Sequence, residues 1–178
     1  MRYKGIAFVF VTLALISFHL AEAQQAKKVA RIGFLSAVSH SSVASRAEAF
    51  QQGLRELGYS EGKDIVVEYR YGEGKRDRLS ELAAELVRLK VEVIVSGGPT
   101  VTRAVQQATV SIPIVMSFDD DPVGSGFVSS LARPGGNITG LSTLYPELSG
   151  KQLELLKEIV PRLSRLAVLG SSTHPGTA

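Results

Sequence analysis

The chain has 178 residues, of which 44% are hydrophobic and 21% charged, and its net charge at pH 7 is +3. This composition is that of a globular protein with a core, and it excludes disordered, collagen-like and coiled-coil chains. The basic residues are spread along the chain, so we predict no nucleic-acid-binding surface. Cysteine is absent, which excludes disulfide bonds and a leader that is lipid-anchored through cysteine.

The first 23 residues predict a cleaved signal peptide. Arg2 and Lys4 precede an almost unbroken apolar run over residues 5–20, and residues 21–23 read Ala-Glu-Ala, the small-x-small pattern of a cleavage site. The alternative is a membrane anchor, but the run is short of the about 20 residues that span a bilayer. We therefore expect cleavage after Ala23 and export to a bacterial periplasm.

Short β-branched runs and helical patterns alternate after the leader. Strands are predicted at residues 29–35, 65–71, 91–96, 112–118 and 138–142. Helices are predicted to follow the first four strands, ending near Leu57 and covering residues 77–89, 101–108 and 123–131. The alternation predicts an α/β fold, a doubly wound parallel sheet over residues 29–142 with helices on both faces.

Two residues predict helix ends. Gly58 stands where a left-handed residue ends a helix. Asp77 precedes a helical pattern and is expected to cap it.

The pattern changes after residue 142. A connector over residues 143–149 leads to a predicted helix at 150–160 and a predicted strand at 165–169. A lone helix–strand unit leaves a strand edge unpaired, so residues 143–178 are expected to be a hinge and an incomplete second α/β lobe. Uncovered apolar residues in this part are expected to drive self-association, namely Leu155, Leu166 and Val168.

The turn at residues 97–100, Gly-Gly-Pro-Thr, joins a buried strand to a helix. A strand, a glycine loop and a helix start place backbone N–H groups and a positive helix end beside a small anionic ligand. Many turns of this kind bind nothing, and a plain strand-to-helix turn is the alternative.

Several sequence motifs, in order, resemble the tryptophan/tyrosine-type family of ABC-transporter substrate-binding proteins. They are RIGFLS at 31–36, GLRELGY at 53–59, RLSELAAELV at 78–87, DPVGSG at 121–126, LARPGGNITG at 131–140 and GKQLELLK at 150–157. The resemblance covers residues 29–175. It implies a periplasmic binding protein whose two lobes close on a small solute, in this family aromatic amino acids where known. It also implies delivery to a membrane permease, with no catalysis and no cofactor.

The chain departs from the family pattern in two ways. It ends just inside the second lobe. Residues 119–122 read Asp-Asp-Asp-Pro, where the family has an apolar residue and glycine before the Asp-Pro pair.

Ligands of doubly wound sheets bind beyond the carboxyl ends of the strands. The candidate binding residues in these loops are Ser36, Ala37, Gly97, Gly98, Thr100, Asp119, Asp121 and Pro122. A ligand carboxylate would suit the helix start at residues 98–100, helped by the hydroxyls of Ser36 and Thr100. A ligand ammonium group would suit Asp121 or Asp119.

Each role has a structural alternative. Ser36 could only end a strand, Thr100 could cap a helix, and Asp121 could interact with a helix start. A metal site is disfavoured because adjacent loop aspartates rarely aim at one point.

Three functions remain open from the sequence. The first is the solute-binding component of an ABC-type uptake system, and the second is a remnant of one that no longer binds. The third is an exported α/β enzyme that uses the aspartates in phosphoryl chemistry. The lack of a phosphate-loop lysine motif argues against this third function.

Overall fold

The structure is a computed structural model that describes residues 29–143 and 145–167. The predicted signal peptide lies outside the described residues, as does Val168. Within the described ranges, none of the helices is long and apolar enough to cross a membrane.

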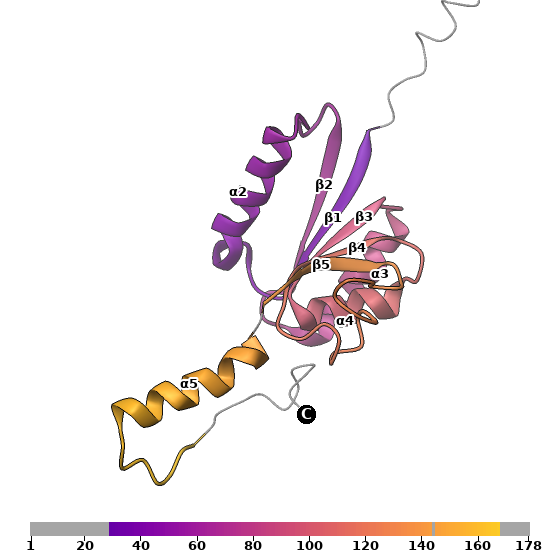
Figure 1. The fold of residues 1–178 in the computed structure, drawn as a ribbon. Coiled ribbons are helices and arrows are strands. Elements are labelled where there is room, and N and C mark those ends of the chain that lie inside the picture. The colour runs from indigo at the N-terminus through magenta and orange to yellow at the C-terminus, as the bar shows by residue number, and fades with distance from the viewer. Residues whose placement is uncertain (1–28, 144, 168–178) are drawn as a thin grey trace, which may run out of the picture.

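The described residues form one parallel sheet and its helices (Figure 1). The strands are β1 (Ala30–Ser36), β2 (Ile65–Tyr71), β3 (Val93–Gly97), β4 (Ile114–Asp119) and β5 (Ile138–Ser142). The helices are α2 (His40–Glu56), the short 3-10 helix η1 (Arg76–Arg78), α3 (Leu79–Arg88), α4 (Pro99–Ala108) and α5 (Tyr145–Ile159). The strands lie in the order β2-β1-β3-β4-β5, and every neighbouring pair is parallel. The predicted doubly wound sheet is confirmed.

Helices cover the two faces of the sheet unequally. Helix α2 lies against one face, whereas α3 and α4 lie against the other (Figure 1). The reason is the strand order, because the step from β1 to β2 runs opposite to the steps toward β3 and β4, and right-handed crossovers then put the helices on opposite faces.

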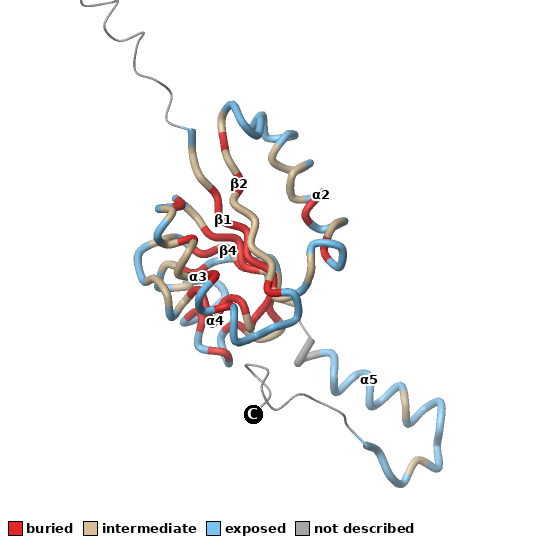
Figure 2. The backbone as a smooth tube through the Cα atoms, turned by 180° about the vertical axis from the view of Figure 1, so that it is seen from behind, coloured by how far each residue is buried: buried red, intermediate tan, exposed pale blue. Residues whose placement is uncertain are grey.

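Two clusters of buried side chains form the core, one on each face. Figure 2 shows that the buried residues concentrate along the strands and on α3 and α4. The larger lies under α3 and α4 and includes Leu35, Leu86, Ile94, Val105 and Ile114, each fully buried. The smaller lies under α2 and joins Phe34, Val67 and Val95 to the partly buried Phe50 and Leu54.

The α2 face is covered only over β2, β1 and part of β3. On this face Thr139 and Ser117 are exposed, and the side chain of Leu141 is 69% exposed. The strands β4 and β5 therefore present an open surface beside α2.

The helix predicted at residues 123–131 is wrong, because this segment is a series of turns. The N–H groups of Phe127 and Val128 both donate to the carbonyl of Pro122, and Gly126 has a φ of 69°. Phe127 and Val128 are buried in the larger cluster, so their apolar character reflects tertiary burial and not helical periodicity.

One helix end agrees with the end predicted from the sequence, and two helix starts differ from their predictions. Gly58 ends α2 with a φ of 86°, as predicted, and the Tyr59 N–H donates to the Leu54 carbonyl across it. Asp77 does not cap α3, since it lies inside η1. Helix α4 starts at Pro99, two residues earlier than predicted, because the fixed φ of proline suits the first helical position.

The carboxyl-terminal part differs more from its prediction. Helix α5 starts at Tyr145, inside the predicted connector, with Pro146 in a first turn where proline is tolerated. Residues 165–167 form no strand, and residues 168–169 lie outside the described part. A strand needs a hydrogen-bonded neighbour, and the sheet ends at β5.

Candidate functional site

Three loops lie side by side at the carboxyl edge of the sheet. The adjacent strands β1, β3 and β4 end there at Ser36, Gly97 and Asp119. The chain leaves β1 and β3 toward opposite sides, so a crevice of the kind that holds ligands in doubly wound sheets opens between these strands. Of the candidate residues, Ser36, Ala37 and Gly97 line one hollow at this edge, whereas the lining does not include Gly98, Thr100, Asp119, Asp121 or Pro122.

The start of α4 is shaped by Gly98 and Pro99. Gly98 has a φ of 109°, and a Cβ there would lie 2.8 Å from Cζ of the Phe118 ring, so a side chain does not fit. No side chain caps α4, and its first turn carries no acidic residue. Thr100 is therefore not a capping residue, and the first-turn N–H groups of α4 have no partner inside the helix.

The β1 loop is held from the side of β2. Carbonyl oxygens of Ser36 and Ala37 accept hydrogen bonds from the N–H groups of Gly72 and Gly74, at 2.8 and 2.9 Å. The buried Ser36 hydroxyl accepts a bond of 3.4 Å from the Val38 N–H. Helix α2 begins just beyond, also without an acidic residue in its first turn. Two positive helix ends thus border the crevice.

The three aspartates of the β4 loop have different surroundings. Asp119 is 1% exposed, and its Oδ1 accepts a bond of 2.9 Å from the Asp121 N–H. Asp120 Oδ1 accepts one of 2.8 Å from the Thr143 hydroxyl. Asp121 is partly exposed, and its Oδ1 accepts one of 2.8 Å from the Gly124 N–H. Of the two predicted ammonium partners, Asp121 is thus the accessible one.

The described residues hold no cluster of metal-ligating side chains. Each carboxylate of the β4 loop is directed to its own hydrogen-bond donor, which is why the run of aspartates does not make a shared site. Pro122, the last predicted residue of this loop, is buried, and its carbonyl shapes the turn that follows.

A hollow of about 580 Å³, here called the α2 groove, includes the candidate residues Ser36, Ala37 and Gly97, but sequence reasoning missed the rest of its lining. It starts at the ends of β1 and β3 and runs between α2 and the open half of the sheet. Its apolar lining comprises Phe34, Val43, Phe50, Val95, Phe118 and Leu141. The guanidinium of Arg46 lies 5.8 Å from the centre of the Phe118 ring. Separate elements supply this lining, so no local pattern reveals it.

A second missed feature is the buried pair Ser96 and Thr102 under the α4 start. Their hydroxyl oxygens are 2.7 Å apart, and the Thr102 hydroxyl also donates to the Gly98 carbonyl over 3.1 Å. The pair ties the end of β3 to the first turn of α4. A threonine four residues after the cap glycine was the available signal.

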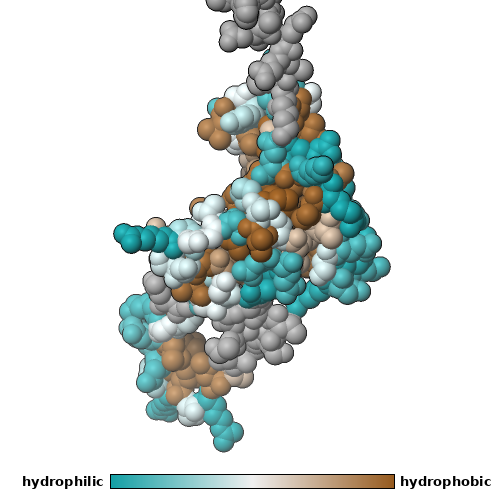
Figure 3. All heavy atoms as spheres, turned by 90° about the vertical axis from the view of Figure 1, so that its right-hand side faces the viewer, coloured by the Kyte–Doolittle hydropathy of each residue, from teal (hydrophilic) through white to brown (hydrophobic). Residues whose placement is uncertain are grey.

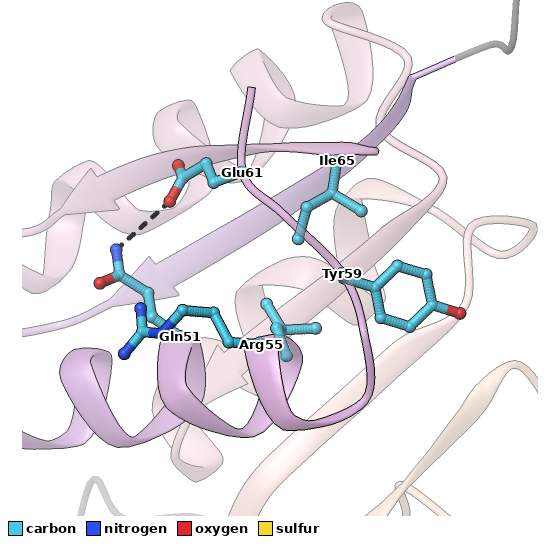
Figure 4. A pocket seen from close by; sticks show the side chains of 6 residues that line it. Gln51, Arg55, Tyr59, Glu61 and Ile65 are labelled. Atoms are coloured by element: carbon cyan, nitrogen blue, oxygen red, sulfur yellow. Dashed lines mark hydrogen bonds between the residues drawn. The ribbon is translucent and has the colours of Figure 1, made fainter. Parts of the chain in front are cut away.

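A smaller hollow lies at the far end of α2 (Figure 4). Its volume is about 50 Å³, and its lining includes Leu54, Tyr59 and Ile65. Gln51 reaches across to Glu61 over 3.5 Å. Ligand pockets are several times larger, so this hollow is no candidate.

Known proteins resemble the chain over most of its length. A model of the ABC transporter substrate-binding protein family matches residues 31–176. A tyrosine-binding protein of Clostridioides difficile is 31% identical over 148 residues, which are 83% of this chain and 42% of that protein.

Two solved structures share its fold. A conserved domain protein of Vibrio cholerae is 31% identical, with a TM-score of 0.74 over 84% of this chain and 50% of that one. An ABC domain from Streptococcus pneumoniae in complex with L-Trp is 28% identical, with a TM-score of 0.72 over the same shares.

The chain spans about half the length of these relatives. The sequence match and the shared lobe agree on the assignment, which is to a family of transport proteins and not of enzymes. The chain belongs to the ABC transporter substrate-binding proteins.

Proposed function

We propose that this chain forms one wall of a solute-binding cleft and serves an ABC-type uptake system. The observation that carries the proposal is the uncapped start of α4, which follows the end of β3, while the partly exposed Asp121 follows the end of the adjacent strand β4. An α-amino acid carries two opposite charges on one carbon, and these two features complement them.

The ligand carboxylate would sit at the first turn of α4. There the N–H groups of Thr100 and Val101 and the positive helix end favour an anion, and the Thr100 hydroxyl adds a donor. Ser36 and Ala37 would form the opposite lip of the crevice, with Gly97 and Gly98 between them. The backbone can approach a ligand closely at these glycines.

The ligand ammonium group would bond to Asp121. Its Oδ1 accepts from the Gly124 N–H, and its other carboxylate oxygen would accept from the ammonium group. Asp119 would act indirectly, because Asp119 Oδ1 accepts a hydrogen bond from the Asp121 N–H and so positions Asp121. The names of two relatives, a tyrosine-binding protein and a domain in complex with L-Trp, support an aromatic amino acid as the solute.

The remaining parts of the proposal concern the whole protein. We propose export through the leader with cleavage after Ala23, delivery of the solute to a membrane permease, and no catalysis or cofactor. Residues 29–142 would form the first lobe, and residues 143–178 the hinge and the start of a second. Proteins of this family are typically exported or periplasmic, which supports the location.

The test is a panel of free amino acids against the chain from Gln24 to Ala178. A ligand at 100 times its dissociation constant stabilises a protein by about 2.7 kcal/mol, so millimolar amino acids are expected to raise the melting temperature even where one wall binds weakly. Aromatic amino acids are expected to give the largest shift. If no amino acid shifts the melting temperature, the chain does not bind this class of solute. The alternative function, a remnant that no longer binds, is then favoured.

An Asp121→Asn variant separates binding from folding. The amide keeps an acceptor for the Gly124 N–H, so the turn is retained while the charge is lost. A hydrogen bond to a charged group contributes about 1.5–3 kcal/mol, so affinity for an amino acid is expected to fall about tenfold or more. The same ligand without its amino group is the matched control. Since this ligand has no ammonium group, Asp121→Asn and the parent should bind it with the same affinity. Equal affinities of variant and parent for the amino acid would remove Asp121 from the site.

A further inference from the structure

The turn at residues 121–128 is fastened to α4 by one arginine. Arg103, in the second turn of α4, donates from its guanidinium to the main-chain carbonyl of Ser125. The centre of the Phe127 ring lies 4.5 Å from Cζ of the same guanidinium. One side chain of α4 therefore contacts both the backbone and an aromatic ring of the turn.

Gln106 adds to this contact. Its Oε1 accepts a bond of 2.9 Å from Arg103, which orients the guanidinium, and its Nε2 donates over 3.3 Å to the Gly126 carbonyl. Arg103 and Gln106 are three residues apart and so share one face of α4. Thr100 lies three residues before Arg103, on the same face. The face of α4 that contacts the turn thus continues to the helix start proposed for the ligand carboxylate.

The contact of Arg103 lies one hydrogen-bonded turn away from Asp121. The Ser125 N–H donates to the Asp121 carbonyl over 2.9 Å, and the Gly124 N–H donates to Asp121 Oδ1 over 2.8 Å. A side chain on Gly124 would collide with the Asp121 carboxylate, so this carboxylate lies directly over the glycine. A shift of Ser125 relative to α4 would therefore carry Asp121 with it.

The contact is withdrawn from solvent. Ser125 and Phe127 are buried, and Arg103 and Gln106 are partly buried. Partial desolvation strengthens the attraction between a guanidinium and an aromatic ring, and a charged donor makes the stronger hydrogen bonds. The surface gives no sign of this contact, because hydrophobic and hydrophilic residues lie interspersed over the lobe in Figure 3.

We propose that Arg103 is a positioning residue for the solute. By fixing the turn at residues 121–128 against α4, it sets the place of the Asp121 carboxylate relative to the α4 start. The inference rests on the proposed function, in which these two features receive the two charges of one amino acid. Both charges are on one carbon of the ligand, so their partners must be held at one short separation. Arg103 acts through Ser125 and Asp121 and does not itself contact the solute.

The first test needs no solute. Hydrogen exchange in the chain from Gln24 to Ala178, followed by NMR, reports the N–H groups of Gly124 and Ser125, which are bonded within the turn. Arg103→Met removes the guanidinium and keeps a long side chain. It is expected to speed exchange of these groups at least about tenfold, while the strands exchange as in the parent. Unchanged exchange in the turn would overturn the proposal, whatever the chain binds.

The matched controls use residues of the same type. Arg88→Met, at an exposed arginine that ends α3, is expected to leave exchange in the turn unchanged. Gln106→Ala is expected to speed it, whereas Gln107→Ala, at the exposed neighbour, is not. If Arg103→Met does not fold, Arg103→Lys takes its place. Its effects are expected to be the same but smaller, because an ammonium group lacks the planar pair of donors.

The second test is calorimetric titration with an amino acid and with the same ligand without its amino group. Arg103→Met is expected to lower the affinity for the amino acid about fivefold and to leave the affinity for the second ligand unchanged. In an Asp121→Asn background the same change is expected to have no further effect, because no charge is left to position. Equal losses for both ligands, or a full further loss in the Asp121→Asn background, would overturn the positioning role.

The two proposals fail separately. If the parent binds no amino acid while Arg103→Met still speeds exchange in the turn, the proposed function is wrong, and the fixing of the turn by Arg103 stands. If the parent binds an amino acid and Arg103→Met changes neither exchange nor affinity, the positioning role is wrong, and the proposed function stands.

Discussion

At the scale of single residues, neighbouring side chains of one type have different tasks. Thr100 and Thr102 both belong to the first turns of α4, yet Thr102 is fully buried against Ser96 while Thr100 is partly exposed. Asp119 and Asp121 differ in the same way. Burial decides which member of each pair can meet a solute.

Replacing each threonine by valine separates these tasks. Thr102→Val leaves the Ser96 hydroxyl without its partner in the core and is expected to lower the free energy of unfolding by about 1–2 kcal/mol. Thr100→Val keeps the shape and is expected to change that free energy by less than about 0.5 kcal/mol. It is expected to weaken solute binding about fivefold through loss of one hydrogen bond. Urea unfolding measures the free energy of unfolding, and calorimetric titration measures the affinity for the solute. If only Thr102→Val weakened solute binding, Thr102 and not Thr100 would be the binding residue.

At the scale of elements, the two helices α2 and α3 end in the same way with different residues. In each, the residue after the last turn is left-handed, with a φ of 86° at Gly58 and 54° at Lys90. The N–H of the following residue reaches back to the Leu54 carbonyl in α2 and to the Leu86 carbonyl in α3. A lysine in this conformation stores strain that glycine avoids.

Lys90→Gly is therefore expected to stabilise the protein. Relief of the left-handed strain outweighs the added freedom of the unfolded chain, for a net gain of about 0.5–1 kcal/mol in the free energy of unfolding. Gly58→Ala, at the equivalent position of α2, is the matched control and is expected to lose about 1 kcal/mol. The midpoints of urea unfolding measure both, and a destabilised Lys90→Gly would show that the lysine side chain itself contributes.

Two partly buried tyrosines on β2, Tyr69 and Tyr71, predict that the stability of the protein falls in alkali. Tyr69 lies 5.5 Å from Phe34 between ring centres, and its hydroxyl accepts a bond of 2.8 Å from Gln51. Burial raises the pKa of the Tyr69 phenol above its ordinary value of 10.0, and Glu61 raises it further, while the Gln51 bond lowers it. Burial, followed by Tyr69, likewise raises the pKa of Tyr71.

Since both phenols hold their protons more tightly in the folded chain, the unfolded chain loses its protons first as the pH rises. Their contribution to stability is thus complete below about pH 10, the unfolded value, and is lost as the pH rises through the folded value. Tyr69→Phe is expected to flatten the fall in the urea midpoint above pH 10. Tyr59→Phe, at a 48% exposed position, is the control and is expected to keep the parent's profile. If the urea midpoint of Tyr69→Phe falls above pH 10 as steeply as that of the parent, Tyr69 is not the cause of the fall.

At the scale of the whole molecule, the lobe and α5 are distinct in packing. The two core clusters draw on the strands, on α2, α3 and α4 and on loop residues such as Phe127, and none of their members comes from residues 148–159 of α5. The lobe is therefore expected to fold without α5.

A chain that ends at Thr143 tests this independence. Its urea midpoint, measured by circular dichroism, is expected to equal that of the longer chain. Leu86→Ala, in the fully buried centre of the larger cluster, is the contrast and is expected to cost about 3 kcal/mol. Loss of the folded signal on removal of α5 would show that this helix belongs to the core.

The sequence by itself determined the five strands of the described lobe, the doubly wound class, the left-handed end of α2 and the family. These follow from local patterns, namely side-chain periodicity, glycine conformation and motif order, which each segment carries within itself. The binding residues stay a prediction. The sequence also placed their three loops at one edge, because parallel strands that step in register must end together.

Only the tertiary structure decided what each loop residue touches. The segment at 123–131 became turns because Phe127 and Val128 are buried by neighbours distant in the sequence, a gain that outweighs local helix propensity. Asp119 is buried while Asp120 and Asp121 stay partly exposed, for the same non-local reason. The α2 groove depends on which face each crossover takes, and that is a property of the strand order and not of any one segment.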